Sequence, residues 1–178
     1  MEWRDLARHP KMEYRADMQT YEPEGPVLPV DVAFTSEAAR LLYRDSLRPA
    51  TAASAGTDLR AALEADEAVI SPGQRMAVAT GVRVQPRAPG WAGFVYSRSG
   101  LGARDGLTVA QGVGVIDPDY TGEITVFLLN TSGEERRIHR GERIAQLIFQ
   151  PFAAPRFTVV ADLSATGRGA GGFGHTGR

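Results

Sequence analysis

In the segment WAGFVYSRSGLGARDGLTVAQGVGVIDPDYTGEITVFLL (91–129), short apolar runs alternate with turns that contain glycine, serine or proline. The runs cover residues 91–96, 107–109 and 123–129, and the turns between them include SGLG and DPDYTG. Short runs at close spacing, broken by turn residues, are typical of an all-β sandwich or barrel. The segment therefore predicts an all-β fold.

The same pattern continues on both sides of this segment. Val30, Val32 and Phe34 alternate with other residues, as in a half-buried strand, and residues 37–44 (EAARLLYR) are the best candidate for a helix, with Ser36 as its N-cap. The remaining runs that read as strands are 58–63, 75–80, 82–85, 144–149 and 157–160. The 20 glycines and 11 prolines also suit many strands and turns better than a helical bundle.

The chain of 178 residues is long enough for one ordinary domain. Residues 1–26 show no sustained period and end in YEPEGP, so we expect an N-terminal extension that is poorly ordered or docked on a partner. Residues 27–166 form the predicted β domain. Residues 167–178 (GRGAGGFGHTGR) are so rich in glycine that composition alone predicts a flexible tail.

Composition excludes several classes of function. The net charge of −1 argues against an electrostatic grip on nucleic acid or on an anionic membrane. The absence of cysteine excludes disulfides and thiolate zinc sites, and three scattered histidines make a polyhistidine metal site a poor expectation. No apolar run approaches the ~20 residues of a membrane span, and the start lacks a signal-peptide apolar region. We therefore expect a cytoplasmic domain without nucleic-acid or membrane partners.

Two segments combine residues that suit phosphate chemistry. AGTDLRA (55–61) opens a strand with a Gly–Thr–Asp group, in which Asp58 could do no more than cap a turn. SRSGLG (97–102) places an arginine, a hydroxyl and a glycine on consecutive positions after an aromatic strand. This combination can hold phosphate oxygens, although in isolation it could equally be a simple hairpin turn.

Two further segments carry polar groups among apolar neighbours. GVGVIDPDYTGEI (112–124) places Asp117 and Asp119 in a tight turn beside Tyr120. A carboxylate there could act as a general base, or it could be an exposed turn aspartate. RGERIAQLIFQP (140–151) is an amphipathic strand in which Gln146 could be functional or only a buried and satisfied amide.

Taken in order with the glycine-rich end (RGAGGFGHTG), these four segments resemble the five motifs of the trimeric deoxyuridine triphosphatases, the dUTP diphosphatase or dUTPase family. The resemblance runs from Ala55 to Gly177, and VLPVDVAF before it also resembles the family's first strand. It implies a jelly-roll-like β fold in a homotrimer whose active sites are shared between subunits. It also implies hydrolysis of dUTP to dUMP and pyrophosphate, with Mg²⁺ held on the triphosphate.

Carried over position by position, the resemblance makes Asp117 the base that activates water for attack on the α-phosphorus. Tyr120 would pack under the deoxyribose, and the backbone of residues 112–116 would bind the uracil edge. Asp58 would lie in the outer shell of the metal. The other residues of the core domain that the resemblance assigns to substrate binding are Arg98, Ser99, Gly100, Gln111, Gly112, Val115, Ile116 and Gln146.

The resemblance also gives the tail a second reading, as a lid that becomes ordered only with ligand. Arg168 would clamp the γ-phosphate, and glycine amides, including that of Gly172, would wrap the phosphates. Phe173 would stack on uracil from a neighbouring subunit, and Thr176 would contribute to substrate binding.

Three positions depart from the family's usual pattern. Ser97 stands where proline is common, which predicts a slightly looser phosphate turn. Gln111 stands where asparagine is frequent, which puts a uracil contact by its side chain in doubt. His175 replaces a serine, which puts one phosphate contact in doubt.

Two other functions compete on the same scaffold. A dCTP deaminase resembles this fold, but its catalytic glutamate lies three residues before an asparagine, and counting back from Asn130 reaches Phe127. A non-catalytic nucleotide-sensing module should have lost Asp117, Arg168 or Phe173, and all three are present.

Overall fold

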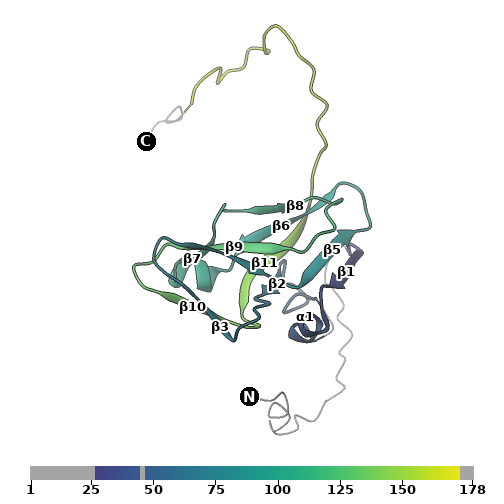
Figure 1. Cartoon of the computed structure of the whole chain (residues 1–178). Coiled ribbons are helices and arrows are strands. Elements are labelled where there is room, and N and C mark those ends of the chain that lie inside the picture. The colour runs from purple at the N-terminus through teal and green to yellow at the C-terminus, as the bar shows by residue number, and fades with distance from the viewer. Residues whose placement is uncertain (1–26, 45–46, 173–178) are drawn as a thin grey trace, which may run out of the picture.

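The computed structural model describes residues 27–44 and 47–172, and in them the chain is almost entirely strands and loops (Figure 1). Every strand pairing is antiparallel. The strands are β1 (Val30–Phe34), β2 (Thr57–Arg60), β3 (Glu67–Ile70), β4 (Arg75–Ala79), β5 (Val82–Pro86), β6 (Trp91–Ser97), β7 (Leu107–Val109), β8 (Gly114–Ile116), β9 (Thr125–Asn130), β10 (Arg136–His139) and β11 (Arg143–Pro151). The all-β class predicted from the sequence is confirmed.

The strands form four small sheets around one core. The largest has the order β2-β11-β6-β8, and a three-stranded sheet has the order β4-β9-β7. The pairs β1-β5 and β10-β3 complete the set (Figure 1). Because β11 lies between β2 and β6, segments that are far apart in the sequence become neighbours at the end of this sheet, where Asp58 is opposite Gln146.

Alternation along the strands builds the core. In β9, Val126 and Leu128 are buried whereas Phe127 between them is exposed, as the two-residue period of a strand requires. The largest fully buried apolar side chains are Leu59, Ile70, Leu107, Ile124, Leu128, Ile138, Ile144 and Leu147. They come from β2, β3, β7, β9, β10, β11 and the loop before β9, so a single core joins all the larger sheets.

The helix α1 (Glu37–Leu42) forms where the sequence predicts it, but ends two residues earlier than the predicted range. Ser36 is its N-cap, and its hydroxyl accepts a hydrogen bond from the Ala39 amide at 3.0 Å. The chain then leaves the helix through Arg44, whose φ of 50° lies in the left-handed region. That conformation cannot continue a right-handed helix, which accounts for the early end.

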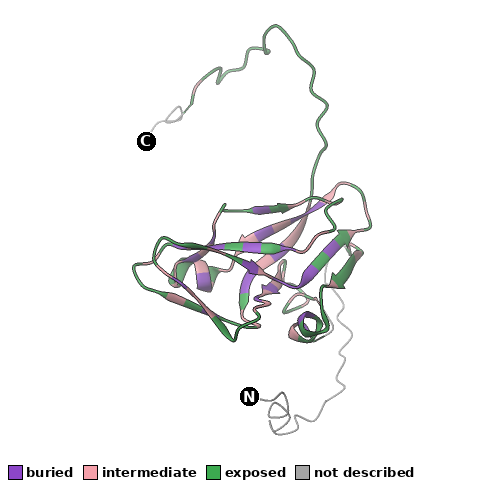
Figure 2. Ribbon diagram, in the orientation of Figure 1, coloured by how far each residue is buried: buried purple, intermediate pink, exposed green. Residues whose placement is uncertain are grey.

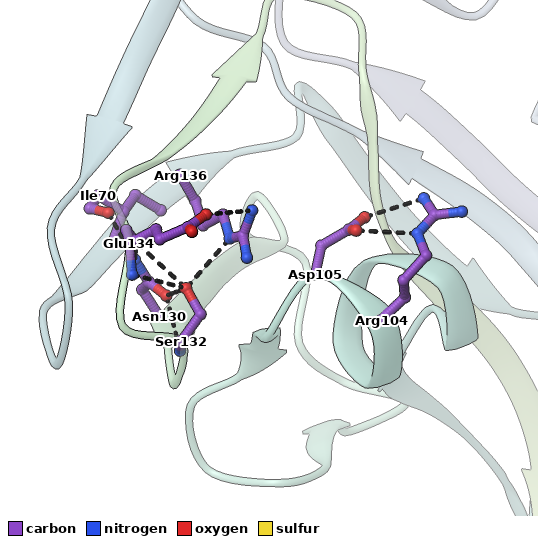
Figure 3. A network of polar contacts seen from close by, with 7 residues as sticks. All are labelled: Ile70, Arg104, Asp105, Asn130, Ser132, Glu134 and Arg136. Atoms are coloured by element: carbon purple, nitrogen blue, oxygen red, sulfur yellow. Dashed lines mark hydrogen bonds and ion pairs between the residues drawn. The ribbon is translucent and has the colours of Figure 1, made fainter.

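One fully buried amide, that of Asn130, ties the end of β9 to its surroundings (Figure 3). Its Nδ2 donates to the backbone oxygens of Ile70 at 2.8 Å and Glu134 at 2.7 Å. Its Oδ1 accepts from the amide of Ser132 at 2.9 Å and from the Ser132 hydroxyl at 2.7 Å. Both hydrogens of Nδ2 and two acceptor positions of Oδ1 are therefore in hydrogen bonds, as expected for a buried amide.

The prediction of a strand over residues 157–160 is wrong. After β11 the chain runs away from the domain as an extended arm, residues 152–172, that is exposed along nearly its whole length (Figure 2). Phe157 is 88% exposed and Val159 99% exposed. The residue types favour a strand, but a strand also needs a neighbouring strand to satisfy its backbone, and the described part of the chain offers none to this segment.

Candidate active site

A cavity of about 290 Å³ opens between the β8 hairpin and β9. Five residues expected at the site lie on its wall, namely Gln111, Val115, Ile116, Asp117 and Tyr120. Apolar side chains of β6, β7 and β9 line the rest, together with Glu123 and Thr125. The cavity has the apolar walls and few polar groups that suit a small planar ring.

The turn after β8 places Asp117 and Tyr120 side by side on this wall. The Tyr120 amide donates to the backbone oxygen of Asp117 at 3.0 Å, which closes the turn that contains Pro118. The phenol oxygen of Tyr120 donates to the backbone oxygen of Glu123 at 3.0 Å. Among the described residues, none forms a hydrogen bond with the carboxylate of Asp117, so its oxygens can accept a proton from a bound molecule.

Local backbone geometry also places two glycines of the hairpin, namely Gly114, which lines the cavity, and Gly112, which is not among the lining residues. Gly112 has a φ of 81°, a conformation that side chains disfavour, and its amide closes a tight turn to the Val109 oxygen at 3.0 Å. A Cβ on Gly114 would lie 3.3 Å from Nε2 of Gln111. The amide of Gln111 therefore lies against the Gly114 backbone at the cavity.

A second group of polar residues lies at the end of the β2-β11-β6 sheet, where Asp58 is shared by two arginines. Its Oδ1 accepts from Nε of Arg98 at 2.7 Å, and its Oδ2 accepts from Nη1 of Arg143 at 3.2 Å. The Arg98 and Asp58 side chains are only 28% and 23% exposed, so this pair is screened less than a surface ion pair. Two guanidinium groups against one carboxylate leave the cluster with excess positive charge.

Gln146 is fixed in the same group. Its Nε2 donates to the backbone oxygen of Ser97 at 3.1 Å. Its Oε1 lies near Gly56, where an added Cβ would be 2.6 Å away, so a side chain at position 56 would require the amide of Gln146 to move. Gln146 is thus half-buried, and its amide is held in place beside Ser97.

The segment after Arg98 is helical rather than a hairpin turn. Ser99 adopts helical backbone angles, and residues Gly100–Arg104 form a single π-helical turn, labelled η2. The Gly102 amide donates to the Arg98 oxygen at 2.7 Å. Ser99 is exposed and its hydroxyl makes no capping hydrogen bond, so the hydroxyl can face a ligand.

The side chain of Ser97 makes a hydrogen bond that a proline at this position could not make. Its hydroxyl oxygen accepts a hydrogen bond from the Val109 amide at 2.8 Å. This bond ties the start of the Arg98–Ser99–Gly100 segment to β7, whose Val109 lines the cavity. The sequence predicts a looser turn here, whereas the structure shows an additional tie.

The residues expected in the lid lie apart from both groups. In the exposed arm, Nε of Arg168 donates to the Gly171 oxygen at 2.8 Å. A Cβ added to Gly172 would have no other atom within 4 Å, so this residue lies in open space. Neither residue lines the cavity. Phe173, His175 and Thr176 lie outside the described residues.

Three residues of the site escaped prediction. Glu123 and Phe127 line the cavity, and Arg143 shares Asp58. Arg143 stands three residues before Gln146 in the same motif, so the arginine in RIAQ was the available signal. Phe127 occupies the position at which a deaminase would need a glutamate, and the structure places its side chain on the cavity wall.

Together the cavity and the arginine cluster define a class of protein, a β-domain with adjoining places for a planar ring and for phosphate groups. Among known proteins, the dUTPase family profile matches residues 43–177. A deoxyuridine 5'-triphosphate nucleotidohydrolase of Desulfitobacterium hafniense is 45% identical over 128 residues, which is 72% of this chain and 84% of the relative. One of Escherichia coli is 43% identical over 129 residues, which is 72% of this chain and 85% of the relative.

A solved structure of a Staphylococcus bacteriophage 80alpha dUTPase with dUPNHPP is also similar, with a TM-score of 0.73 and 25% identity. The similarity covers 84% of this chain and 99% of the phage chain. The chain belongs to the dUTPase family. This confirms the family, the all-β fold and the hydrolase class expected from the five motifs. In the part of the chain that the structure describes, no helix is both long and apolar enough to cross a membrane.

Proposed function

We propose that this protein hydrolyses dUTP to dUMP and pyrophosphate. The observation that carries the proposal is the placement of Asp117, Tyr120 and the β8 backbone on one wall of a ring-sized cavity in a member of the dUTPase family. Curated relatives at 42–45% identity bear the name of this activity. The reaction would remove dUTP, which keeps uracil out of DNA, and supply dUMP for synthesis of dTMP in the cytoplasm.

The hairpin supplies the selectivity for base and sugar. Backbone groups of residues 112–116 bind the uracil edge, and the hairpin that they form is too tight for the methyl group of thymine. Tyr120 lies under the deoxyribose and excludes a ribose 2′-hydroxyl. Packing alone discriminates by only ~1–3 kcal/mol when a pocket can yield, so strong selectivity requires a stiff hairpin. The turn hydrogen bond from Tyr120 to Asp117 and the ring of Pro118 contribute that stiffness.

The polar cluster binds the phosphates. Arg98, held by Asp58, offers guanidinium donors, while the Ser99 hydroxyl and the Gly100 amide offer two more. Gln146 contributes its amide. The lid residues Arg168, Gly172, Phe173 and Thr176 close over the nucleotide and exclude bulk water from the reacting centre.

Asp117 acts as the general base. Its carboxylate takes a proton from a water molecule, and the resulting hydroxide attacks the α-phosphorus. The bond from the α-phosphorus to the oxygen that bridges to the β-phosphorus breaks, and its electron pair leaves with pyrophosphate. The proton on Asp117 is then released to solvent, which restores the carboxylate.

Mg²⁺ fits this arrangement as an ion carried by the substrate. Within residues 27–44 and 47–172 no three side chains of the metal-binding kind are grouped together, and Mg²⁺ binds mainly through phosphates and waters. Both oxygens of Asp58 already accept from arginines but keep lone pairs for metal-bound water, which suits an outer-shell place. When bound, the ion orients the triphosphate and offsets charge on the leaving pyrophosphate.

A homotrimer with shared sites accounts for two features of the single chain. The apolar side chains of the arm, such as Phe157 and Leu163, have no cover of their own. Arg168 also lies on this arm, away from the cavity that it is expected to serve. An arm that packs on a second copy resolves both, because it buries the apolar residues and brings the lid to a neighbour's site.

The test is pyrophosphate release with Mg²⁺ from dUTP, dTTP, dCTP and UTP. Asp117→Asn should retain nucleotide binding and lose ~10²–10⁴-fold in turnover. Asp119→Asn, two residues away in the same exposed turn, is the matched control and should keep its rate. Near-normal turnover of Asp117→Asn contradicts the mechanism. Binding of dUTP without release favours the sensing module, and release of ammonia from dCTP favours the deaminase.

A further inference from the structure

The ring of Tyr120 is folded back over Gly122. A Cβ added to Gly122 would lie 2.5 Å from the phenol oxygen of Tyr120 and 2.6 Å from its Cζ. The phenol oxygen continues past this glycine and donates to the backbone oxygen of Glu123 at 3.0 Å. The tyrosine ring therefore occupies the space that any side chain at position 122 would need.

The acceptor of that hydrogen bond is itself fixed by a turn from another sheet. The buried amide of Gly81, between β4 and β5, donates to Oε1 of Glu123 at 2.6 Å. The Thr80 hydroxyl donates to the backbone oxygen of Ile124 at 2.7 Å, and the Ile124 amide donates to the Val82 oxygen at 2.9 Å. Residues 80–82 thus hold residues 123–124 from both the side-chain and the backbone sides.

Tyr120 needs such support because it is not buried. Its side chain is 45% exposed at the cavity, so packing by apolar neighbours does not determine its position. Among the described residues, two hydrogen bonds position Tyr120, namely the turn bond from its own amide and the bond from its hydroxyl to Glu123. The first bond fixes the backbone of Tyr120, and the second fixes the hydroxyl end of its ring.

We infer that Gly122 and Glu123 are positioning residues that set the height of the Tyr120 ring and thereby the selectivity of the site for deoxyribose over ribose. The inference rests on the proposed function, in which this ring lies under the sugar. If the ring could move away from the sugar by a fraction of an ångström, the site would admit the 2′-hydroxyl oxygen of a ribose. Contact with Gly122 and the hydrogen bond to Glu123 prevent that movement.

The test compares kcat/KM for dUTP and for UTP in four variants of the full chain. Gly122→Ala should displace the ring, lower the dUTP-to-UTP ratio about 10- to 200-fold, the range that one small group in a pocket controls, and raise KM for dUTP more than it changes kcat. Gly133→Ala is the matched control, because a Cβ at Gly133 meets nothing within 4 Å, and its ratio should equal that of the parent protein.

Glu123→Gln retains an acceptor for the Gly81 amide, whereas Glu123→Leu removes it. The ratio of the glutamine variant should therefore stay above that of the leucine variant, a rescue that a merely structural role would show only in the melting temperature. Unchanged selectivity in Gly122→Ala, with dUTP still hydrolysed, overturns the inference alone. Failure of the parent protein to hydrolyse dUTP overturns the proposed function instead. If Gly122→Ala does not fold, the two Glu123 variants decide.

Discussion

The hydroxyl oxygen of Ser97 accepts a hydrogen bond from the backbone amide of Val109 at 2.8 Å. The two residues stand at the two functional parts of the site, since Ser97 precedes Arg98 and Val109 lines the ring-sized cavity. The backbone oxygen of Ser97 also accepts from Gln146. One serine thus joins the cluster of Asp58, Arg98 and Gln146 to the cavity.

Ser97→Ala should lower both stability and affinity. It leaves the amide of Val109, a residue only 3% exposed, without its partner, which costs about 1–3 kcal/mol of unfolding free energy. It should also raise KM for dUTP, because the segment that carries Arg98 loses one tie. Urea unfolding and steady-state kinetics measure the two effects. Ser97→Thr keeps the hydroxyl and should recover most of the loss, and equal stability of the alanine variant contradicts the assignment.

Asp58→Asn should weaken binding of the triphosphate. The oxygen of the new asparagine side chain can still accept from Arg98, but its nitrogen cannot accept from Arg143. One charge-assisted hydrogen bond and the negative charge of Asp58 are therefore lost. Bonds of this kind contribute about 1.5–3 kcal/mol, which corresponds to a rise in KM for dUTP of about 10- to 100-fold. Asp66→Asn is the control, because Asp66 pairs with Arg140 at 3.6 Å while fully exposed, and its KM should not change.

Deletion of residues 167–178 should abolish most turnover and leave the fold intact. Among the described residues, those of this segment touch neither the core nor the cavity, so no buried area is lost from the single chain. In the proposed function, however, the site loses Arg168 and the lid that would close over the nucleotide. Pyrophosphate release and the urea midpoint, measured on the same preparation, separate these effects. A full rate in the truncated protein argues against the lid, and a large drop in the midpoint argues that the tail has a structural role.

Tyr43 predicts a loss of stability at alkaline pH. Burial raises the pKa of its phenol to about 12, above the value of about 10 that an unfolded tyrosine has. Because the folded pKa is the higher one, this contribution to stability is complete below pH 10 and is lost as the pH rises toward 12. The unfolding free energy of the parent protein should therefore fall over this range more steeply than that of Tyr43→Phe.

At pH 7, where the phenol is neutral in both states, the parent protein should be more stable than Tyr43→Phe. The Tyr43 oxygen donates to the Thr80 backbone oxygen at 3.0 Å and accepts from the Arg60 amide at 2.8 Å, and Tyr43→Phe leaves both groups unpaired. The variant should be less stable by about 1–3 kcal/mol. Tyr96→Phe is the control with a smaller expected loss, because its hydroxyl reaches Gln150 only at 3.4 Å. Parallel pH profiles for parent and Tyr43→Phe contradict the burial of the phenol.

Sequence reasoning worked where apolar alternation is strong and failed where pairing depends on distant segments. The runs that became β4, β5, β7 and β11 are rich in apolar residues and were predicted. β3 and β10 escaped because EAVI does not alternate and RRIH is mostly polar. They form a sheet because residues 136–139 pair with residues 67–70, which lie far away in the sequence. Residues 157–160 show the converse, with the right residue types and no partner strand.

The site follows the same division. Motif spacing sufficed to put Asp117 and Tyr120 on one turn, because four consecutive residues fix their own geometry. Spacing could not reveal that Glu123 is held by the amide of Gly81, since that contact depends on how two sheets pack. Nor could it show that Arg98 and Arg143 share Asp58, which requires β2 and β6 to flank β11.

The extended arm has a kinetic consequence. Residues 152–166 connect the last strand to the glycine-rich end, and a chain of this length spans at most about 50 Å. A tether of that kind keeps the attached segment at a local concentration of about millimolar around any site within its reach. In the proposed homotrimer, closure of the proposed lid would then be a first-order event whose rate does not depend on the amount of enzyme. A free peptide with the sequence of residues 167–178 competes with the tethered copy only when its own concentration exceeds about a millimolar.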